Sequence, residues 1–396
     1  MRKVYIVGAV RTPIGKIGGA LRTTSALELS VVVLTEVIKR AGIKNNQIDE
    51  VIWGQVRQNS DFANIARVLV LAAKLPYELP AYTVNRLCGS SMQALYSGYQ
   101  QIMIGDADII VSGGVENMSQ AFHYISNGRW GDGPLKLIDT NLEAVTNCHP
   151  TDIFGAVPMG MTAENIAEKF NITREDQDRF ALQSQRRAVK AIAEGKFKNE
   201  IVPVEVKSKK GVQIFDTDEY PKTDVTMEKL AKLPPAFKKD GTVTAGNACG
   251  RNDAASAVVL MSDEKVKELG IQPMAQVLGI TRAGVDPMLM GLGPIPAVRN
   301  ALAKTNLKMS DIDLMECNEA FAVQCIACIN ELGYTEEKTN VNGGGISLGH
   351  PVGATGTRLV TTLLYEMGRR KSKYGIATMC IGGGQGMAVL VENLQR

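Results

Sequence analysis

The chain is 396 residues long, with 45% hydrophobic and 21% charged side chains, which is typical of a globular protein of two to three domain-sized units. Its net charge of +3 provides no global basic field for nucleic acid or an anionic membrane surface, and no apolar run approaches the roughly 18 residues of a membrane-spanning helix. Seven cysteines, and a first apolar run that Arg11 and Pro13 interrupt, are unlike a secreted protein and predict reduced thiols in the cytoplasm.

Three apolar runs in the first part of the chain predict strands, at residues 48–54, 83–85 and 108–114. Between the second and third runs, apolar side chains from Met92 onward keep helical spacing, and Gly105 ends the predicted helix. This part of the chain therefore reads as strand, strand, helix, strand.

A lone cysteine, Cys88, stands at or just before the start of this predicted helix. The free backbone N–H groups and the dipole of a helix N-terminus favour an anion, so we expect a lowered thiol pKa and a nucleophilic thiolate. Gly89 lets other atoms approach the backbone closely. The alternative is that Cys88 packs as a small hydrophobic side chain.

The stretch at residues 121–251 differs in character, because turn-rich and charged pieces alternate with helical patterns. Long inserts on a rigid scaffold usually carry binding function, so we expect a loop or lid domain over the site. The apolar run at 253–261 predicts a strand that returns the chain to the first unit. We therefore predict a discontinuous first unit (1–120 plus 252–273), this inserted domain, and a second unit (274–396).

The second unit repeats the order of the first, with predicted strands at residues 312–320, 340–342 and 376–384 and a helical pattern between the last two. The apolar runs are nearly continuous, as in strands that helices cover on both faces. We therefore predict an α/β protein built from two related units that pack together around a shared axis.

His350 stands at the start of the helical pattern in the second unit, where it is the counterpart of Cys88. A histidine in this position is a natural base for the thiol, although a hydrogen-bonded core histidine is the alternative. The preceding GGGISLG resembles a phosphate loop, but it has neither the lysine of a Walker loop nor the spacing of a dinucleotide fingerprint, so we reject a nucleotide site.

Further candidate side chains follow the predicted strands of the second unit. Cys380 stands just before three glycines, whose backbone N–H groups could bind an oxyanion. Asn318 could hold a water or a carbonyl oxygen, or it could cap the next helix. Cys325 and Cys328 form a C-x-x-C pair inside that helix, where core packing is favoured over zinc binding because no second pair matches it.

Several motifs, in this order, resemble the thiolase family, and the resemblance runs essentially from end to end. They are VRTPIGKIGGAL (10–21), VNRLCGSS, GGVENMS (113–119), MGMTAEN (159–165), FKKDGTVTAGNACG (237–250), CNEAFA (317–322), GGGISLGHPVGATG and CIGGGQG. The resemblance implies a thiolase-like α/β fold, with two pseudo-symmetric βαβ-type halves in an αβαβα layered arrangement and an inserted loop domain.

The resemblance also implies a role for each reactive residue. Cys88 would become acylated, and His350 would activate it. Cys380 would move a proton at the α-carbon of the second acetyl-CoA. Asn318 would hold a water that stabilises the enolate oxygen together with His350. The backbone N–H groups of Cys88 and Gly382 would form a second oxyanion pocket.

The implied reaction condenses two acetyl-CoA molecules to acetoacetyl-CoA, reversibly, through an acyl-cysteine. Two alternatives stay open: a degradative 3-ketoacyl-CoA thiolase of broader chain length, and a CoA- or lipid-binding member without activity. Coenzyme A would be substrate and product, and no other cofactor and no metal would be needed. The partners implied are acetyl-CoA and other acyl-CoA thioesters, rather than nucleic acid or membrane, with the chain as a homodimer or homotetramer.

The resemblance extends to the substrate channel. The residues expected to line it by motif match are Met159, Phe237, Ala248, Cys249, Met290, Ala320 and Phe321, with Lys222 near the nucleotide end. Four positions depart from the usual family pattern: Cys249 replaces a common serine, Pro158 a histidine of acetoacetyl-specific members, Ser91 a glycine, and Gly345 an alanine. The departure at Pro158 puts a strict short-chain preference in question.

Overall fold

The computed structural model describes residues 2–208 and 211–395, and none of the helices in these two ranges has the length and apolarity needed to cross a membrane.

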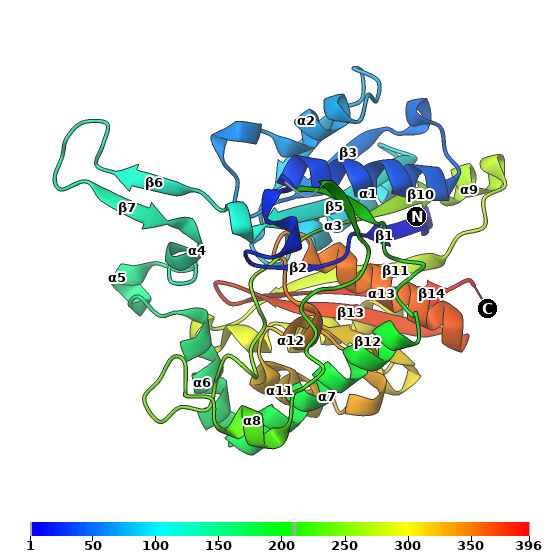
Figure 1. Ribbon diagram of the computed structural model, residues 1–396. Helices are drawn as coiled ribbons and strands as arrows, with labels where there is room; N and C mark the ends of the chain where they lie inside the picture. The colour runs from blue at the N-terminus through cyan, green and yellow to red at the C-terminus, as the bar shows by residue number, and fades with distance from the viewer. Residues whose placement is uncertain (1, 209–210, 396) are drawn as a thin grey trace.

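A ten-stranded sheet forms the centre of the molecule (Figure 1). Its strands, in order across the sheet, are β4 (Ala81–Val84), β3 (Glu50–Gly54), β5 (Ile109–Asn117), β10 (Asn252–Ser262), β1 (Val4–Arg11), β11 (Ala275–Gly284), β14 (Gln385–Asn393), β13 (Tyr374–Ile381) and β12 (Leu314–Cys317), and β2 (Gly15–Lys16) pairs with β10. Two hairpins stand apart from it, β6 (His123–Ser126) with β7 (Lys136–Asp139) and β8 (Val204–Ser208) with β9 (Gly211–Phe215). The α-helices are α1 (Ala26–Ala41), α2 (Ile65–Ala72), α3 (Ser90–Ile104), α4 (Thr140–Glu143), α5 (Thr151–Phe154), α6 (Met159–Phe170), α7 (Arg174–Ala193), α8 (Met227–Ala231), α9 (Asp263–Leu269), α10 (Pro294–Thr305), α11 (Ala322–Glu331), α12 (Gly345–Leu348) and α13 (Thr355–Arg370).

Apart from β4, the strand order reads alike from each end of the sheet toward its middle. β3 pairs in parallel with β5, as β12 does with β13, and β5 and β13 each have an antiparallel neighbour, β10 and β14. The two halves join where β1 and β11 pair antiparallel over residues 4–6 and 275–277. The predicted repeat of two related α/β units is therefore confirmed. The run at 253–261 lies in β10, between β1 and β5.

The layers follow from the alternation of side chains along the strands. In β5, Ile109 and Val111 face a hydrophobic core that α1 and α2 cover, whereas Ile110 faces a second core beneath α3. In β13, Ile376 faces a third core under α10 and α11, and Ala377 faces the core of α13. The helices α3 and α13 therefore lie between the two halves of the sheet (Figure 1), and the αβαβα arrangement is confirmed.

The two central helices meet at their N-terminal ends. A Cβ added at Gly356 would lie 2.4 Å from the backbone nitrogen of Met92, so glycine permits the close approach. The backbone N–H of Thr357 donates to Ser91 Oγ at 3.1 Å. Ser91, a departure from the family pattern, thereby satisfies an N–H group that the first turn of α13 leaves without an intrahelical partner. The loops that precede the two helices are thus held side by side.

The segment at residues 121–251 consists of two structurally different parts. The β6–β7 hairpin projects away from the sheet in Figure 1. Helices α6 and α7 instead join the core of the second half, where Ile166 and Phe180 pack with residues of α11. Only part of the segment therefore resembles the expected loop or lid domain, and the domain boundaries stay a prediction.

The helices predicted inside this segment have clear start and stop signals. α7 opens on a capping box, in which the backbone N–H groups of Asp176 and Thr173 donate to each other's side-chain oxygens, both at 3.1 Å. Gly195 follows the helix with φ +68°, a conformation that favours glycine. These signals explain why the helical pattern of the sequence gives an α-helix of this length.

The strand predicted at 340–342 is wrong. Thr339 alone forms an isolated bridge, to Met315 of β12. The side chain of Asn340 takes the place of a further backbone pair, because its Oδ1 accepts from Cys317 N at 2.8 Å and its Nδ2 donates to Cys317 O at 2.7 Å. A carboxamide has the same donor and acceptor groups as a peptide unit, so the edge of β12 is satisfied without a strand.

Candidate active site

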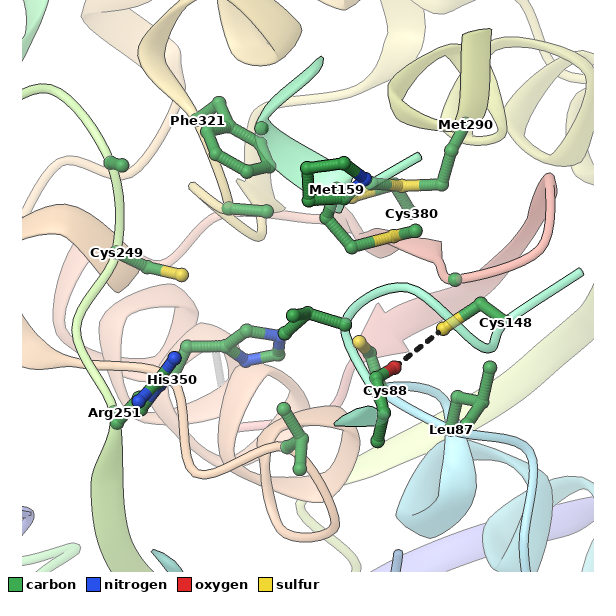
Figure 2. A pocket seen from close by; sticks show the side chains of 18 of the residues that line it. Leu87, Cys88, Cys148, Met159, Cys249, Arg251, Met290, Phe321, His350 and Cys380 are labelled. Carbon is green, nitrogen blue, oxygen red and sulfur yellow. Dashed lines mark hydrogen bonds between the residues drawn. The ribbon is translucent and has the colours of Figure 1, made fainter. Parts of the chain in front are cut away.

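A cavity of about 230 Å³ opens where the two halves and the inserted segment meet. The residues of the predicted site that line it are Cys88, Met159, Phe237, Ala248, Cys249, Met290, Ala320, Phe321, His350, Cys380 and Gly382. Figure 2 shows Cys88, His350 and Cys380 around the same space. Asn318 and Lys222 are not part of this lining. The fold therefore brings together three reactive side chains that are far apart in the sequence.

Cys88 lies in a tight turn between β4 and α3. Leu87 adopts φ +46°, which is uncommon for a residue other than glycine. The backbone N–H of Arg86 donates to Ser90 Oγ at 2.9 Å, across the turn. The helix begins at Ser90 with Gly89 as its N-cap residue, so the predicted position of Cys88 just before a helix is confirmed.

The electrostatic surroundings of Cys88 differ from the expectation. Burial raises the pKa of the Cys88 thiol, while the backbone N–H of Gly382 and the charge of Arg57 act in the opposite direction, and the net pKa is raised. The expected lowering is wrong, because burial disfavours the thiolate more than the N–H groups and the cation favour it. Cys88 is therefore a thiol at rest, and a base must take its proton before it can act as a nucleophile.

His350 is fixed by contacts to its backbone and to its ring. Its backbone N–H donates to Asn252 Oδ1 at 3.0 Å, and its Nδ1 lies 2.7 Å from Thr355 Oγ1. Burial, and then the charge of Arg358, lower the pKa of His350 to about 3. The imidazole is therefore neutral at physiological pH, which is the state that a general base requires.

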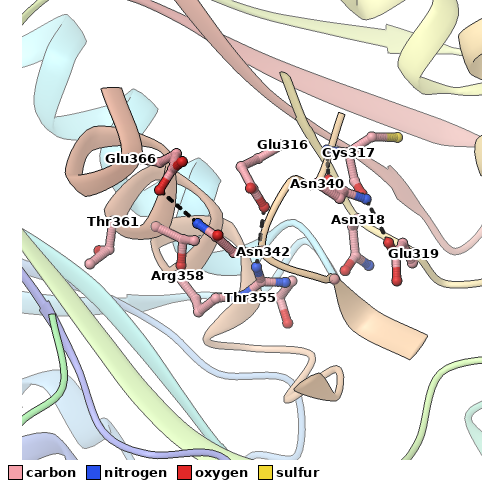
Figure 3. Close-up of polar contacts among 12 residues, drawn as sticks. Glu316, Cys317, Asn318, Glu319, Asn340, Asn342, Thr355, Arg358, Thr361 and Glu366 are labelled. Carbon is pink, nitrogen blue, oxygen red and sulfur yellow. Dashed lines mark hydrogen bonds and ion pairs between the residues drawn. The ribbon is translucent and has the colours of Figure 1, made fainter. Parts of the chain in front are cut away.

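Asn318 follows β12, next to Cys317 and Glu319 (Figure 3), and its side chain contacts His350. Its Nδ2 lies 3.4 Å from both ring nitrogens of His350. Its Oδ1 is buried and has no hydrogen-bond partner within the described ranges, and such an atom is a place where an ordered water binds. The alternative that Asn318 caps the next helix is wrong, because α11 begins at Ala322 after Phe321.

Cys380 reaches the cavity from the end of β13 and is 2% exposed. Burial raises the pKa of its thiol well above the ordinary value, and the neighbouring Cys88 adds to this effect. Gly383 and Gly384, with φ +77° and +80°, form the turn that follows. Both reactive cysteines are therefore protonated at rest, so each needs a proton acceptor.

Cys148 is a cavity residue that no sequence motif marks. It lies beside Cys88 in Figure 2, and its Sγ donates to Ala144 O at 3.1 Å. Burial, and then the neighbouring Cys88, raise the pKa of this thiol to about 11. A Cβ added at Gly382 would lie 2.9 Å from Cys148 Sγ. The inserted segment thus supplies the wall that faces the end of β13.

Aromatic and small side chains form another wall of the cavity. The rings of Phe237 and Phe321 meet edge to face, with centroids 6.4 Å apart. Ala248 forms a bridge with Phe321, and the backbone N–H of Cys249 donates to Ala320 O at 3.0 Å. Burial raises the pKa of the Cys249 thiol to about 12, so this departure from the family pattern presents a neutral thiol to the channel.

Met159 and Met290 complete the apolar lining close to Cys380 (Figure 2). Pro158 lines the same cavity as the N-cap residue of α6. Methionine side chains adapt their shape readily, so this wall can adjust to a bound acyl group.

Lys222 lies outside this cavity and lines a second hollow of about 170 Å³, together with Lys229. The ring of Tyr220 separates the two spaces. Lys222 Nζ lies 5.9 Å from the centroid of this ring, and a Cβ added at Gly250 of the main cavity would lie 2.4 Å from Tyr220 Cζ. The placement of Lys222 near a nucleotide end of the channel stays a prediction.

Three cysteines of the second half cluster in the core. Cys317 Sγ and Cys325 Sγ lie 3.9 Å apart, and Cys328 Sγ donates to Gly291 O at 3.3 Å. All three are buried, as the core-packing interpretation predicts. Across residues 2–208 and 211–395, no group of three or more His, Cys, Asp or Glu side chains is arranged to hold a metal ion.

The chain is similar to known proteins over essentially its whole length. Residues 4–264 match the family model "Thiolase, N-terminal domain", and residues 271–393 match "Thiolase, C-terminal domain". The acetyl-CoA acetyltransferase of Syntrophomonas wolfei subsp. wolfei is 52% identical, over 99% of this chain and 100% of the relative. The crystal structure of the Bacillus anthracis acetyl-CoA acetyltransferase has a TM-score of 0.96 at 46% identity, and covers 100% of this chain and 99% of its own. Human mitochondrial 3-ketoacyl-CoA thiolase in complex with CoA has a TM-score of 0.94 at 42% identity, and covers 99% of this chain and 98% of its own.

Proposed function

The chain belongs to the thiolase family, and from this premise we propose that it is an acetyl-CoA C-acetyltransferase, which converts two acetyl-CoA into acetoacetyl-CoA and CoA. The observation that carries the proposal is the position of Cys88, His350 and Cys380 around one cavity. The names of the full-length relatives support acetyl transfer as the reaction. Coenzyme A is substrate and product, and the proposed steps require no other cofactor.

The first half-reaction acylates Cys88. Neutral His350 takes the thiol proton, and the thiolate attacks the carbonyl carbon of acetyl-CoA. The carbon–sulfur bond to CoA then breaks, and the CoA thiolate takes the proton from His350. Because burial raises the pKa of Cys88, the thiolate forms only when His350 accepts the proton at the moment of attack. An acyl thioester on Cys88 results.

The second half-reaction forms the carbon–carbon bond. His350, neutral again, first accepts the proton of Cys380. The Cys380 thiolate then removes an α-proton from a second acetyl-CoA, and a water held by Asn318 stabilises the enolate oxygen together with the protonated His350. The α-carbon attacks the carbonyl carbon of the acyl group on Cys88. The oxygen of that group accepts hydrogen bonds from the backbone N–H groups of Cys88 and Gly382. The carbon–sulfur bond to Cys88 then breaks, the Cys88 thiolate takes the proton from His350, and acetoacetyl-CoA leaves, so that both thiols and the neutral imidazole are regenerated. Thiolysis of acetoacetyl-CoA is the same sequence in reverse.

The cavity also suggests how CoA reaches the reactive thiols. The facing rings of Phe237 and Phe321, with Ala248 and Cys249, form an apolar passage that suits the pantetheine arm. The hollow beyond Tyr220 carries Lys222, whose ammonium group suits phosphate, and Lys229, whose Nζ lies 2.7 Å from Asp224 Oδ2. We propose that the nucleotide end of CoA binds on that side.

A broader degradative 3-ketoacyl-CoA thiolase is the second candidate. Pro158 favours it, because this residue lines the cavity where acetoacetyl-specific members often carry histidine. The names of the full-length relatives, acetyl-CoA acetyltransferase, favour the first candidate instead. A CoA-binding protein without activity is disfavoured, because Cys88, His350, Cys380 and Asn318 are all present.

We propose a cytoplasmic homodimer or homotetramer. The β6–β7 hairpin exposes Ile125, Leu135 and Leu137, and Trp130 beside them is 81% exposed. Several exposed apolar side chains on a projecting hairpin suit a second copy of the chain. Light scattering after size-exclusion chromatography tests this, and a monomer at micromolar concentration would contradict it.

The proposed reaction is tested by incubating the protein with acetyl-CoA alone and separating the products by chromatography. We expect acetoacetyl-CoA and free CoA in equal amounts, and we expect thiolysis when acetoacetyl-CoA and CoA are supplied. The ratio of kcat/KM for acetoacetyl-CoA and a 3-ketoacyl-CoA of eight or more carbons separates the two candidates. A preference for the longer substrate would favour the degradative enzyme, and no turnover of either would contradict both.

A further inference from the structure

Among the described residues, the ring of His350 makes its shortest polar contact with Thr355. Its Nδ1 lies 2.7 Å from Thr355 Oγ1, at the first position of α13, and both side chains are buried. A neutral imidazole carries one proton, on either Nδ1 or Nε2. The choice decides whether Nε2 can accept a proton, so the hydroxyl of Thr355 bears directly on the chemistry.

The hydroxyl proton of Thr355 has an acceptor within its own helix turn. Thr355 Oγ1 lies 2.9 Å from Pro351 O, four residues earlier, and a carbonyl oxygen can only accept. This contact is the usual bond of a helical threonine to the carbonyl one turn back. A hydroxyl that donates to Pro351 O is left with lone pairs, and it then accepts the Nδ1–H of His350.

The other neighbours of His350 do not make this choice. Asn318 Nδ2 is 3.4 Å from both ring nitrogens, so it favours neither. Asn252 Oδ1 accepts the backbone N–H of His350 at 3.0 Å and fixes the main chain rather than the ring. A Cβ added at Gly349, which has φ +107°, would lie 2.4 Å from Asn252 Cγ, so the main chain is closely held. Thr355 is therefore the neighbour that selects the tautomer of His350.

We propose that Thr355 is a positioning residue, which accepts the Nδ1–H of His350 and holds the imidazole in the tautomer whose Nε2 is free to take the Cys88 proton. The second clause rests on the proposed function, whereas the tautomer itself does not. No proton transfer passes through Thr355. Because the pKa of His350 is lowered to about 3, the ring is neutral and its tautomer matters throughout the physiological range.

Two substitutions separate this role from a packing role. Thr355→Val keeps the shape of the side chain but removes the acceptor, and Thr355→Ser restores it. Thr361→Val is the matched control, because Thr361 Oγ1 makes the same bond to the carbonyl four residues earlier, Thr357 O at 2.8 Å, on the same helix. Thr361 is buried like Thr355, so both valine variants lose one helix bond of the same kind.

We expect Thr355→Val to slow acylation of Cys88 by about 10–100-fold, the usual size of a lost orienting hydrogen bond, with the KM for acetyl-CoA within about twofold. Thr355→Ser should regain most of the rate, and Thr361→Val should keep it. Equal losses of rate in both valine variants, or no loss in Thr355→Val, would overturn the proposal.

The tautomer is read directly by nuclear magnetic resonance of protein labelled with ¹⁵N-histidine. The chain has only three histidines, and His350→Gln identifies the signal of His350. We expect the Nδ1–H form in the wild type and loss of that preference in Thr355→Val. An Nε2–H form in the wild type would overturn the proposal. Because this spectrum requires no turnover, it stays informative even if the proposed reaction were wrong.

Discussion

The turn after β13 offers the sharpest test of how the cavity is built. Gly382 has no side chain, and a methyl group there would lie 2.9 Å from Cys148 Sγ and 3.1 Å from Leu87 Cδ1. Both distances are shorter than an ordinary contact, so the variant Gly382→Ala must displace the turn or its neighbours. The backbone N–H of Gly382 points at the Cys88 sulfur, so a displaced turn also withdraws the oxyanion donor that we propose.

The effects of Gly382→Ala on stability and on kcat can both be estimated from the structure. Overpacking lowers the free energy of unfolding by about 1–3 kcal/mol. Replacing a glycine raises it by about 0.4–1 kcal/mol, because the unfolded chain then has less conformational entropy. We therefore expect a net decrease of about 1–2 kcal/mol. For 396 residues, with an unfolding entropy of about 2.1 cal/mol/K per residue, this lowers Tm by about 1–3 °C. Loss of one oxyanion donor lowers kcat by about 10²–10³-fold.

The double variant Gly382→Ala with Cys148→Ala identifies the cause. Removing the Cys148 sulfur removes the shorter contact, and the flexible end of Leu87 can move by a few tenths of an ångström. We expect the double variant to regain about tenfold or more in kcat relative to Gly382→Ala, a clear departure from additivity. The assays are steady-state condensation of acetyl-CoA and thermal unfolding at fixed protein concentration.

Gly279→Ala on β11 is the control, because its methyl group would meet only Thr305 Cγ2, at 3.7 Å. The reasoning would be refuted if Gly382→Ala condensed acetyl-CoA at the wild-type rate, or if the double variant were slower than the single one.

Two further predictions concern His350 and Cys148. Because the pKa of His350 falls from its ordinary 6.5 to about 3 on folding, the unfolded state binds the extra proton between these values, and the free energy of unfolding falls by about 1.4 kcal/mol for each pH unit below 6.5. Between pH 6.5 and pH 5, the free energy of unfolding of the wild type should therefore fall by about 2 kcal/mol more than that of His350→Gln, as measured by thermal unfolding. Parallel pH curves for the two proteins would contradict this. Cys148→Leu should fill space beside Cys88 and lower kcat/KM for a longer 3-ketoacyl-CoA about tenfold more than for acetoacetyl-CoA. A difference of this size is expected because the fit of a substrate in an apolar pocket changes its binding by roughly 1–3 kcal/mol. Equal losses on both substrates would show that Cys148 does not face the acyl group.

The sequence predicted those features that depend on local pattern and on repeated order. The positions of Cys88 and His350 before equivalent helices could be read from helical spacing and glycine signals, and the structure places both at one cavity. The motif match likewise named eleven of the 23 residues that line the cavity. Such patterns are visible in one dimension because each element carries its own signal.

Features that depend on contacts across the fold could not be read in this way. Burial around Cys88 raises a thiol pKa that its place before a helix would lower, and burial is a property of the packed layers. Asn340 replaces a strand pair by a side chain, which no apolar run encodes. Cys148 lies in a turn-rich stretch without periodicity, and only the folded insert brings it to Cys88. Lys222 proved to lie beyond Tyr220, in a neighbouring hollow.

The central claim is that Cys88 carries the acyl group and Cys380 moves the α-proton, and it is tested by incubating three variants with radiolabelled acetyl-CoA. We expect Cys88→Ala to take up no label and to have no turnover. Cys380→Ala should take up label yet condense very slowly. Cys328→Ala should behave like the wild type, because Cys328 is buried and does not line the cavity. Stable label on Cys88→Ala, or unimpaired condensation by Cys380→Ala, would contradict the account.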